Sequence, residues 1–170
     1  MTSELTIFSL LAVGAIASAI LMITRRSPVV SVLYLIVHFF LLATLYLTLQ
    51  AQFIAIIQIL VYAGAIMVLF LFVIMLLNLS DEQRLREKIT NKTIVAALFA
   101  AAMFAQIAIV FVVGTSDGPQ ALAPNAAEIG SVESIGKALF TKFLFPFEVT
   151  SILLLAAIVG VVVLAKKKFH

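Results

Sequence analysis

Four polar side chains recur along one face of an otherwise apolar stretch in the first third of the chain. They lie four, three and four positions apart, which places them on one side of an α-helix: Ser27, Ser31, Tyr34 and His38. His38 falls near the middle of that stretch. An imidazole at this depth must either hydrogen-bond to a neighbouring helix or line a hydrated cavity. Two interpretations stay open: a neutral packing residue, or an element of a proton or water path.

A second polar group lies in the next apolar stretch. Gln58 and Tyr62 are four positions apart, and the small triplet Ala63-Gly64-Ala65 follows directly. Small residues allow neighbouring helices to approach closely. Glycine also lowers the cost of leaving α-helical geometry. The triplet therefore indicates either close helix packing or a π-bulge, an irregularity that is frequent at functional sites.

The composition identifies the solvent around these residues. Of the 170 residues, 64% are hydrophobic and 11% are charged, and the mean hydropathy is +1.25. About a quarter of the residues in a soluble domain are charged. A cytosolic globular enzyme and a disordered tail are excluded, and a net charge of only +3 argues against binding to nucleic acid. We predict an integral membrane protein in contact with the lipid bilayer.

Five apolar stretches are long enough to cross a bilayer, which takes about 20 residues. We predict an all-α protein with a single membrane domain over residues 1–170 and an external loop over residues 115–146. The predicted spans are residues 5–24, 29–49, 53–78, 93–114 and 147–165. We expect the first span to be a retained helix and not a cleaved signal, because the basic pair Arg25-Arg26 follows its apolar run.

Basic residues predict the orientation of these spans. If the five spans alternate, nine of the eleven Lys and Arg residues fall on one side, and the other side holds only Lys137 and Lys142. The positive-inside rule then gives a periplasmic N-terminus and a cytoplasmic C-terminus in the inner (plasma) membrane. Residues 134–145, which carry both lysines between apolar positions, are expected to form an amphipathic segment at the membrane interface.

Several kinds of chemistry are excluded by missing residue types. The chain has no Cys, and its two His residues are His38 and His170, so we expect no catalytic, cofactor-binding or metal-binding residues. No charged side chain lies between Arg26 and Asp81, whereas a subunit that pumps protons by itself would be expected to carry one. The main titrating groups of any proton path are therefore expected in other chains.

The third span carries a resemblance to a known family. It reads FIAIIQILVYAGAIMVLFLFVIMLLN, with Tyr62, Gly64, Ala65 and Val68 in a Tyr-x-Gly-small-x-x-Val arrangement. This segment resembles the signature helix of the chain J (chain 6) family of NADH:quinone oxidoreductase, respiratory complex I. Outside the third span the similarity is one of architecture: five spans, an external N-terminus and a long loop before the last helix.

The resemblance implies a membrane-arm subunit of a proton-pumping NADH:quinone oxidoreductase, lying among chains A, H and K and an antiporter-like chain. It has no redox centre of its own, so NADH, FMN, iron–sulfur clusters and quinone belong to other subunits. Related subunits of a cation/proton antiporter or of a membrane-bound hydrogenase are the alternative. A membrane scaffold without a gating role is a third interpretation.

The resemblance further implies a π-bulge marked by Tyr62 and Gly64. Conversion of the bulge to α-helix would turn an apolar plug and open or close a water path between the quinone cavity and the antiporter-like subunits. The plug consists of Ile66, Met67, Val68 and Phe70. Glutamines stand in the segment from Gln52 to Gln58, where some relatives have an acidic residue. The candidate proton-path and gating residues are His38, Gln58, Tyr62, Gly64, Ala65, Met67, Val68 and Phe70.

Overall fold

The computed structural model describes residues 2–77, 91–114 and 123–166, and within these ranges every element is a helix or a turn. The long elements are α1 (Thr2–Thr24), α2 (Pro28–Thr48), α5 (Asn91–Gly114) and α8 (Leu144–Ala165), together with the third span. That span is continuous and consists of α3 (Gln52–Ile57), the π-helix η1 (Gln58–Ile66) and α4 (Met67–Leu77). Two short helices, α6 (Ala126–Ile129) and α7 (Val132–Thr141), precede α8.

The helix bounds agree with the predicted spans to within three residues at every described end. The basic segment between the third and fourth spans, and residues 115–122 of the predicted external loop, lie outside the described residues. Helix α7 overlaps the predicted amphipathic segment at residues 134–141, and residues 144–145 of that segment belong to α8. The N-cap of α7, Ser131, accepts a hydrogen bond from the Ser134 backbone N–H at 3.2 Å, as serine at this position commonly does.

Among the described residues, four helices are long and apolar enough to cross a membrane: Ser3–Thr24, Pro28–Thr48, Gln52–Leu77 and Leu144–Ala165. Helix α5 contributes a shorter apolar segment, Leu98–Val110, among its described side chains. The all-helical membrane fold is therefore confirmed, and the count of five spans stays a prediction.

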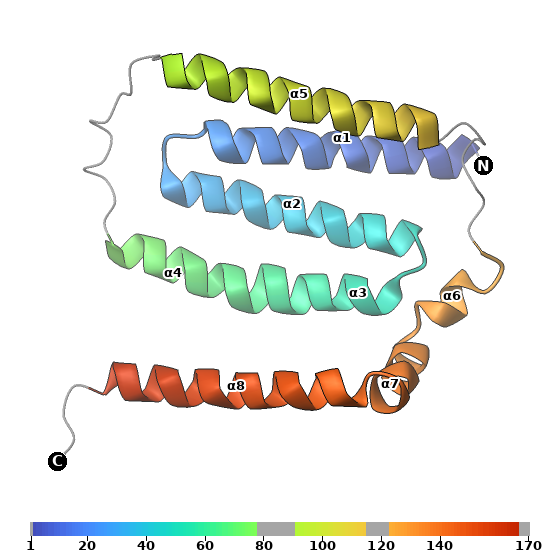
Figure 1. Cartoon of the computed structure of the whole chain (residues 1–170), viewed down its shortest axis with the longest axis vertical. Helices are drawn as coiled ribbons and strands as arrows, with labels where there is room; N and C mark the ends of the chain where they lie inside the picture. The colour runs from blue at the N-terminus through green and yellow to red at the C-terminus, as the bar shows by residue number, and fades with distance from the viewer. Residues whose placement is uncertain (1, 78–90, 115–122, 167–170) are drawn as a thin grey trace.

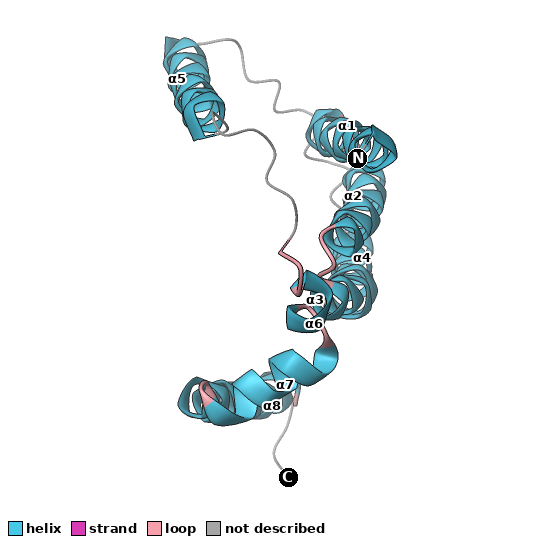
Figure 2. Cartoon of the chain, turned by 90° about the vertical axis from the view of Figure 1, so that its right-hand side faces the viewer, coloured by secondary structure: helices cyan, strands magenta, loops and turns pink. Residues whose placement is uncertain are grey.

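The long helices run in alternate directions along the chain (Figure 1). Helix α1, helix α2 and the third span lie side by side in one layer, whereas α5 and α8 stand away from it (Figure 2). The turn between α2 and α3 lies at the same end of the layer as α6 and α7 (Figure 1).

Small side chains bring α1 and α2 together. Ala15 and Ser18 on α1 are buried, and a side chain at Gly14 would meet the methyl groups of Leu41 on α2 at 3.4 and 3.6 Å. Lipid tails are as apolar as leucine, so helices in a membrane associate through close packing of this kind and through hydrogen bonds between them.

Helices α5 and α8 contrast with this layer. No residue of α8 is buried, and the described side chains of α5 are all exposed. Both helices satisfy their backbone hydrogen bonds internally, as a helix in hydrocarbon must. Their apolar surfaces are therefore left to lipid or to other chains.

Candidate gating and proton-path site

The π-helix η1 lies in the middle of the third span and confirms the predicted irregularity there. Nine residues, Gln58–Ile66, have π geometry, which is more than the single turn of an ordinary π-bulge. At its end the Met67 backbone N–H reaches the carbonyl oxygen of Tyr62, five residues earlier, as well as that of Gly64. No proline interrupts the span, so the change in geometry comes from the packing and from the small residues inside it.

The π-helix shifts the buried face of the third span by one residue. The buried positions are Ala55, Gln58, Ala63 and Met67, which are three, five and four residues apart. A regular α-helix repeats a face every three or four residues. The step of five falls inside η1, so the turn of the π-helix accommodates one extra residue.

The exposed fractions of neighbouring side chains make this shift explicit. Ala63 and Met67 are each 6% exposed, whereas Tyr62 and Ile66, one position earlier, are 45% and 43% exposed. In a regular α-helix continued from Gln58, the four-residue steps would bring Tyr62 and Ile66 to the buried face. The present conformation therefore holds a small side chain and a flexible thioether against α2.

Gly64 lies in a tight position of its own helix. A Cβ atom there would lie 3.3 Å from the carbonyl oxygen of Ile59, and no other atom outside the adjoining turn would lie within 4 Å. The prediction that the triplet Ala63-Gly64-Ala65 packs against a neighbouring helix is right for Ala63 alone, because Ala65 is exposed. The π-helical backbone crowds the position of a side chain at Gly64, and the sequence pattern does not reveal this.

The predicted plug residues are divided between the two faces of the span. Met67 is buried, whereas Val68 and Phe70 are 49% and 45% exposed. In this conformation only Met67 occupies the position between helices. Rotation of α4 would be needed to bring Phe70 to the same face.

Tyr62 contacts α2 through its ring. The ring of Phe39 on α2 meets it edge-on, with centroids 5.6 Å apart and planes at 67°. Among the described residues no group hydrogen-bonds to the Tyr62 hydroxyl, so the contact of Tyr62 with α2 is an aromatic one. Sequence reasoning missed Phe39, because one phenylalanine among 14 in an apolar chain gives no signal.

His38 is held by α1 through one nitrogen. Its Nδ1 lies 3.0 Å from the carbonyl oxygen of Ala15 and 3.2 Å from Oγ of Ser18, and this hydroxyl donates to the same carbonyl at 2.8 Å. A carbonyl oxygen only accepts, so Nδ1 must carry the hydrogen. In the neutral ring Nε2 is then a hydrogen-bond acceptor, and among the described residues no group donates to it.

Ser18 is a second residue that sequence reasoning missed. It is 5% exposed, and its hydroxyl is one of two oxygens that orient the His38 ring. In the sequence, Ser18 stands among small apolar residues of α1, and this pattern indicates only an apolar helix. On the predicted polar face of α2, Tyr34 accepts a hydrogen bond from the Arg25 guanidinium at 3.4 Å. This guanidinium also lies 5.4 Å from the Tyr34 ring centroid.

The ring of Phe39 on α2 lies next to both predicted polar groups. The His38 and Phe39 rings have centroids 6.2 Å apart, and Phe39 in turn contacts Tyr62 in η1. A continuous contact therefore runs from Ser18 on α1 to the π-helix. Within the described residues no group of three His, Cys, Asp or Glu side chains is placed to bind a metal ion.

Comparison with known proteins assigns this arrangement to a family. Residues 18–164 match the family described as NADH-ubiquinone/plastoquinone oxidoreductase chain 6. The chain belongs to this family. It is therefore a membrane subunit of the NADH-quinone oxidoreductase type of complex, a proton-translocating oxidoreductase, as the third-span resemblance implied.

Three relatives are similar over nearly the whole chain. NADH-quinone oxidoreductase subunit J of Rhodobacter capsulatus is 34% identical over 96% of this chain and 82% of its own length. NAD(P)H-quinone oxidoreductase chain 6 of Leptolyngbya boryana is 39% identical, over 98% and 81%. F(420)H(2) dehydrogenase subunit J of Methanosarcina mazei is 36% identical, over 96% and 91%. Their names differ in the electron donor at similar identity, so similarity over this subunit does not follow the donor.

Proposed function

We propose that this chain gates a water path in a proton-pumping NADH:quinone oxidoreductase, between the quinone cavity and the antiporter-like subunits. The observation that carries the proposal is the one-residue shift of the buried face across η1. A helix that holds one extra residue has a second arrangement available, the regular α-helix, which is reached without breaking the chain.

Conversion of η1 to α-helix changes which side chains face α2. One residue occupies about 100° of an α-helical turn, so α4 would rotate by about that angle relative to α3. Tyr62 and Ile66 would replace Ala63 and Met67 on the buried face, and Phe70 would turn inward with them. The gate would thus exchange Ala63 for the larger Tyr62, and the flexible Met67 for the stiffer, β-branched Ile66.

His38 contributes an acceptor to the same path in this proposal. Its Nδ1–H is fixed on Ala15 and Ser18, so water can donate to Nε2. The contact through Phe39 to Tyr62 would make the hydration of His38 sensitive to the state of η1. The chain supplies an oriented acceptor and an apolar gate, and the main titrating groups lie in other subunits.

The partners follow from the surfaces that this chain leaves uncovered. We propose that α5 is the fourth of five spans, and that α5 and α8 pack on chains A, H and K and an antiporter-like chain. NADH, FMN, iron–sulfur clusters and quinone bind to other subunits. We place the N-terminus in the periplasm and the C-terminus in the cytoplasm. The connection between α1 and α2 and the C-cap of α8, which carry basic residues, lie at the opposite end of the molecule from α7 (Figure 1).

The gate is tested by structures of the complete enzyme in a resting and a turnover state. We expect Ala63 and Met67 against α2 in one state, and Tyr62 and Ile66 there in the other. A single buried register in all states, together with normal pumping by a Gly64→Val variant, would leave only the scaffold function.

The orientation has a separate test in intact cells or sealed vesicles. The chain has no Cys, so a single introduced thiol is the only one in this subunit. Its labelling is measured on the gel band of this subunit. Glu128→Cys should react with an impermeant maleimide from the periplasmic side, and Arg26→Cys only from the cytoplasmic side. The reverse pattern would overturn the topology without affecting the gate.

A further inference from the structure

The turn between α2 and α3 contains a residue in the left-handed backbone conformation. The Ala51 N–H donates to the Tyr46 carbonyl at 2.9 Å, and the Gln50 N–H to the Leu47 carbonyl at 3.0 Å. These two bonds form the Schellman motif that closes many helices. Its left-handed position is held by Gln50, with φ of 61°, where glycine is usual.

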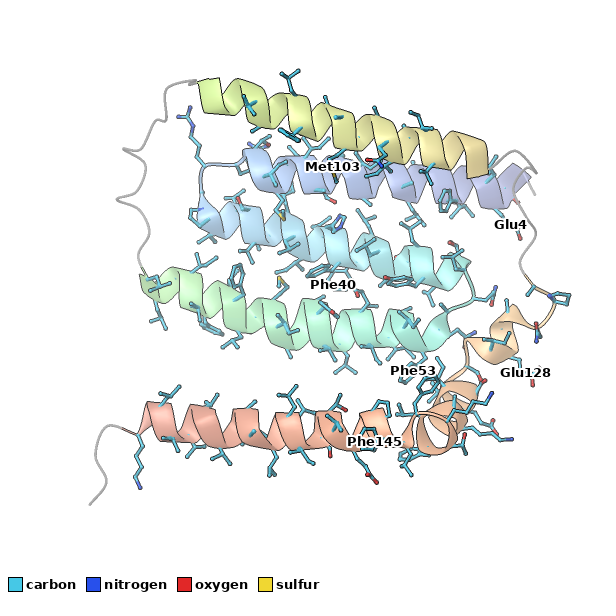
Figure 3. All side chains as sticks on the ribbon, in the orientation of Figure 1. Glu4, Phe40, Phe53, Met103, Glu128 and Phe145 are labelled. Atoms are coloured by element: carbon cyan, nitrogen blue, oxygen red, sulfur yellow. The ribbon has the colours of Figure 1, made fainter. Side chains whose placement is uncertain are left out.

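The start of α3 is capped from a distant segment. The first N–H groups of a helix have no partner within it, and Ala51 at the N-cap supplies no side-chain acceptor. The Phe53 N–H instead donates to the carbonyl oxygen of Gly130 at 3.2 Å. Figure 3 labels Phe53 where the start of α3 meets the α6–α7 segment.

Gly130 fits this position because it has no side chain. A Cβ atom there would collide with the carbonyl oxygen of Gln50 and lie 3.1 Å from Cα of Ala51. Its φ of −79° is open to any residue, so the glycine is required by the close approach and not by its own conformation.

Gly130 is itself held on both sides. Its N–H donates to the Ala126 carbonyl at 2.9 Å at the end of α6, and the next residue, Ser131, caps α7. The residues between two short helices therefore form a rigid corner that meets the turn of the third span backbone to backbone.

We propose that Gly130 is a positioning residue that anchors the external end of the third span, five residues before η1 begins. Because α3 is held at its first turn, a change of register in η1 rotates α4 and leaves the orientation of α3 unchanged. This inference rests on the proposed conversion of η1, and it assigns the external α6–α7 segment a part in the gate.

Hydrogen exchange in the complete wild-type enzyme tests the anchor without any variant. We expect the Phe53 amide to exchange about fivefold more slowly than the Gln52 amide after correction for intrinsic rates, the factor expected for one hydrogen bond of about 1 kcal/mol. Equal corrected rates would show that Gly130 does not hold the start of α3.

The matched variants are Gly130→Ala and Gly136→Ala, one in the corner and one in α7, where an added Cβ would have no atom within 4 Å. At equal amounts of assembled enzyme, Gly130→Ala should remove the protection of Phe53 and lower the number of protons pumped per electron, while quinone reduction continues. Gly136→Ala should change neither quantity. Gly130→Ala with unchanged protection and unchanged proton-to-electron ratio would overturn the anchor.

Structures in two states separate this inference from the proposed gate. If η1 converts and α4 rotates while residues 52–57 keep their orientation, both stand. If η1 converts but residues 52–57 rotate, the gate stands and the anchor fails. If η1 never converts, the gate fails, and the positioning role that depends on it fails with it, even where the exchange data support the hydrogen bond.

Discussion

The third span and α8 are similar apolar helices with different geometry. They have 26 and 22 residues, and each contains one glycine in its interior. In the third span, Gly64 lies in a π-helix, where a Cβ would come 3.3 Å from the Ile59 carbonyl. In α8 the helix is regular, and a Cβ at Gly160 would have no atom within 4 Å.

The difference shows that irregular backbone needs a packing partner. Helix α8 has no buried residue, and a regular α-helix pairs the most backbone groups when no neighbour compensates for a lost bond. The third span packs on α2 through Ala63 and Met67, and this packing can hold an alternative register. A glycine therefore indicates a switch only where the helix geometry would crowd a side chain at that position.

The largest expected effect is that of Gly64→Val. A β-branched side chain would press on the Ile59 carbonyl in the π-helix, whereas an α-helix gains about 0.5 kcal/mol or more when glycine is replaced. We expect a shift of at least tenfold towards α-helix, and an assembled complex that still reduces quinone but pumps few protons. The measurement is the proton-to-electron ratio in vesicles, with Gly160→Val as the control, which should retain it. Normal pumping by Gly64→Val would remove the distinction between the two helices.

A smaller effect is expected from Phe39→Leu. The edge-on contact with Tyr62 contributes about 0.5–1.5 kcal/mol, and conversion to α-helix would move Tyr62 away from its present position. The variant should therefore change the resting-to-active ratio by about two- to tenfold, measured as the lag in NADH oxidation after rest. Phe40→Leu is the control, because Phe40 forms no aromatic pair among the described residues. An unchanged lag in Phe39→Leu would indicate that η1 holds its register without this ring.

Variants of His38 distinguish a packing role of this residue from a role in the proton path. His38→Leu loses both the bond to Ala15 and the Nε2 acceptor, whereas the side-chain amide of His38→Asn can donate in place of Nδ1. If Nε2 takes part in the path, both variants should pump several-fold more slowly at equal assembly. If His38 only packs, His38→Asn should pump at the wild-type rate. Ser18→Ala should then lower the free energy of unfolding by about 1 kcal/mol and leave the pumping rate unchanged.

The smallest expected effect is that of Gly160→Ala. A position inside a regular helix gains up to about 1 kcal/mol from this change, and among the described residues no atom would obstruct the methyl group. Assembly, quinone reduction and pumping should match the wild type in membrane preparations. A loss of assembled complex would instead locate a neighbouring subunit packed closely on α8 at this glycine.

Much of the site could be found in the sequence because polar residues are conspicuous among apolar ones. His38, Gln58 and Tyr62 stand out, and helical spacing places His38 on one face with Tyr34. Ser18, Phe39 and Gly130 could not be found in this way. Each acts through a neighbour that is distant in sequence, and spacing within one helix carries no information about such a neighbour.

The sequence by itself determined the membrane environment and the helix limits to within three residues, because the transfer of apolar side chains into lipid is a sum over local composition. It also indicated that the helix at Gly64 could be irregular. Only the tertiary structure decided that nine residues adopt π geometry, that Ala63 and Met67 occupy the buried face, and that Gly130 caps α3. These features depend on the free energy of contacts between helices, which no single segment contains.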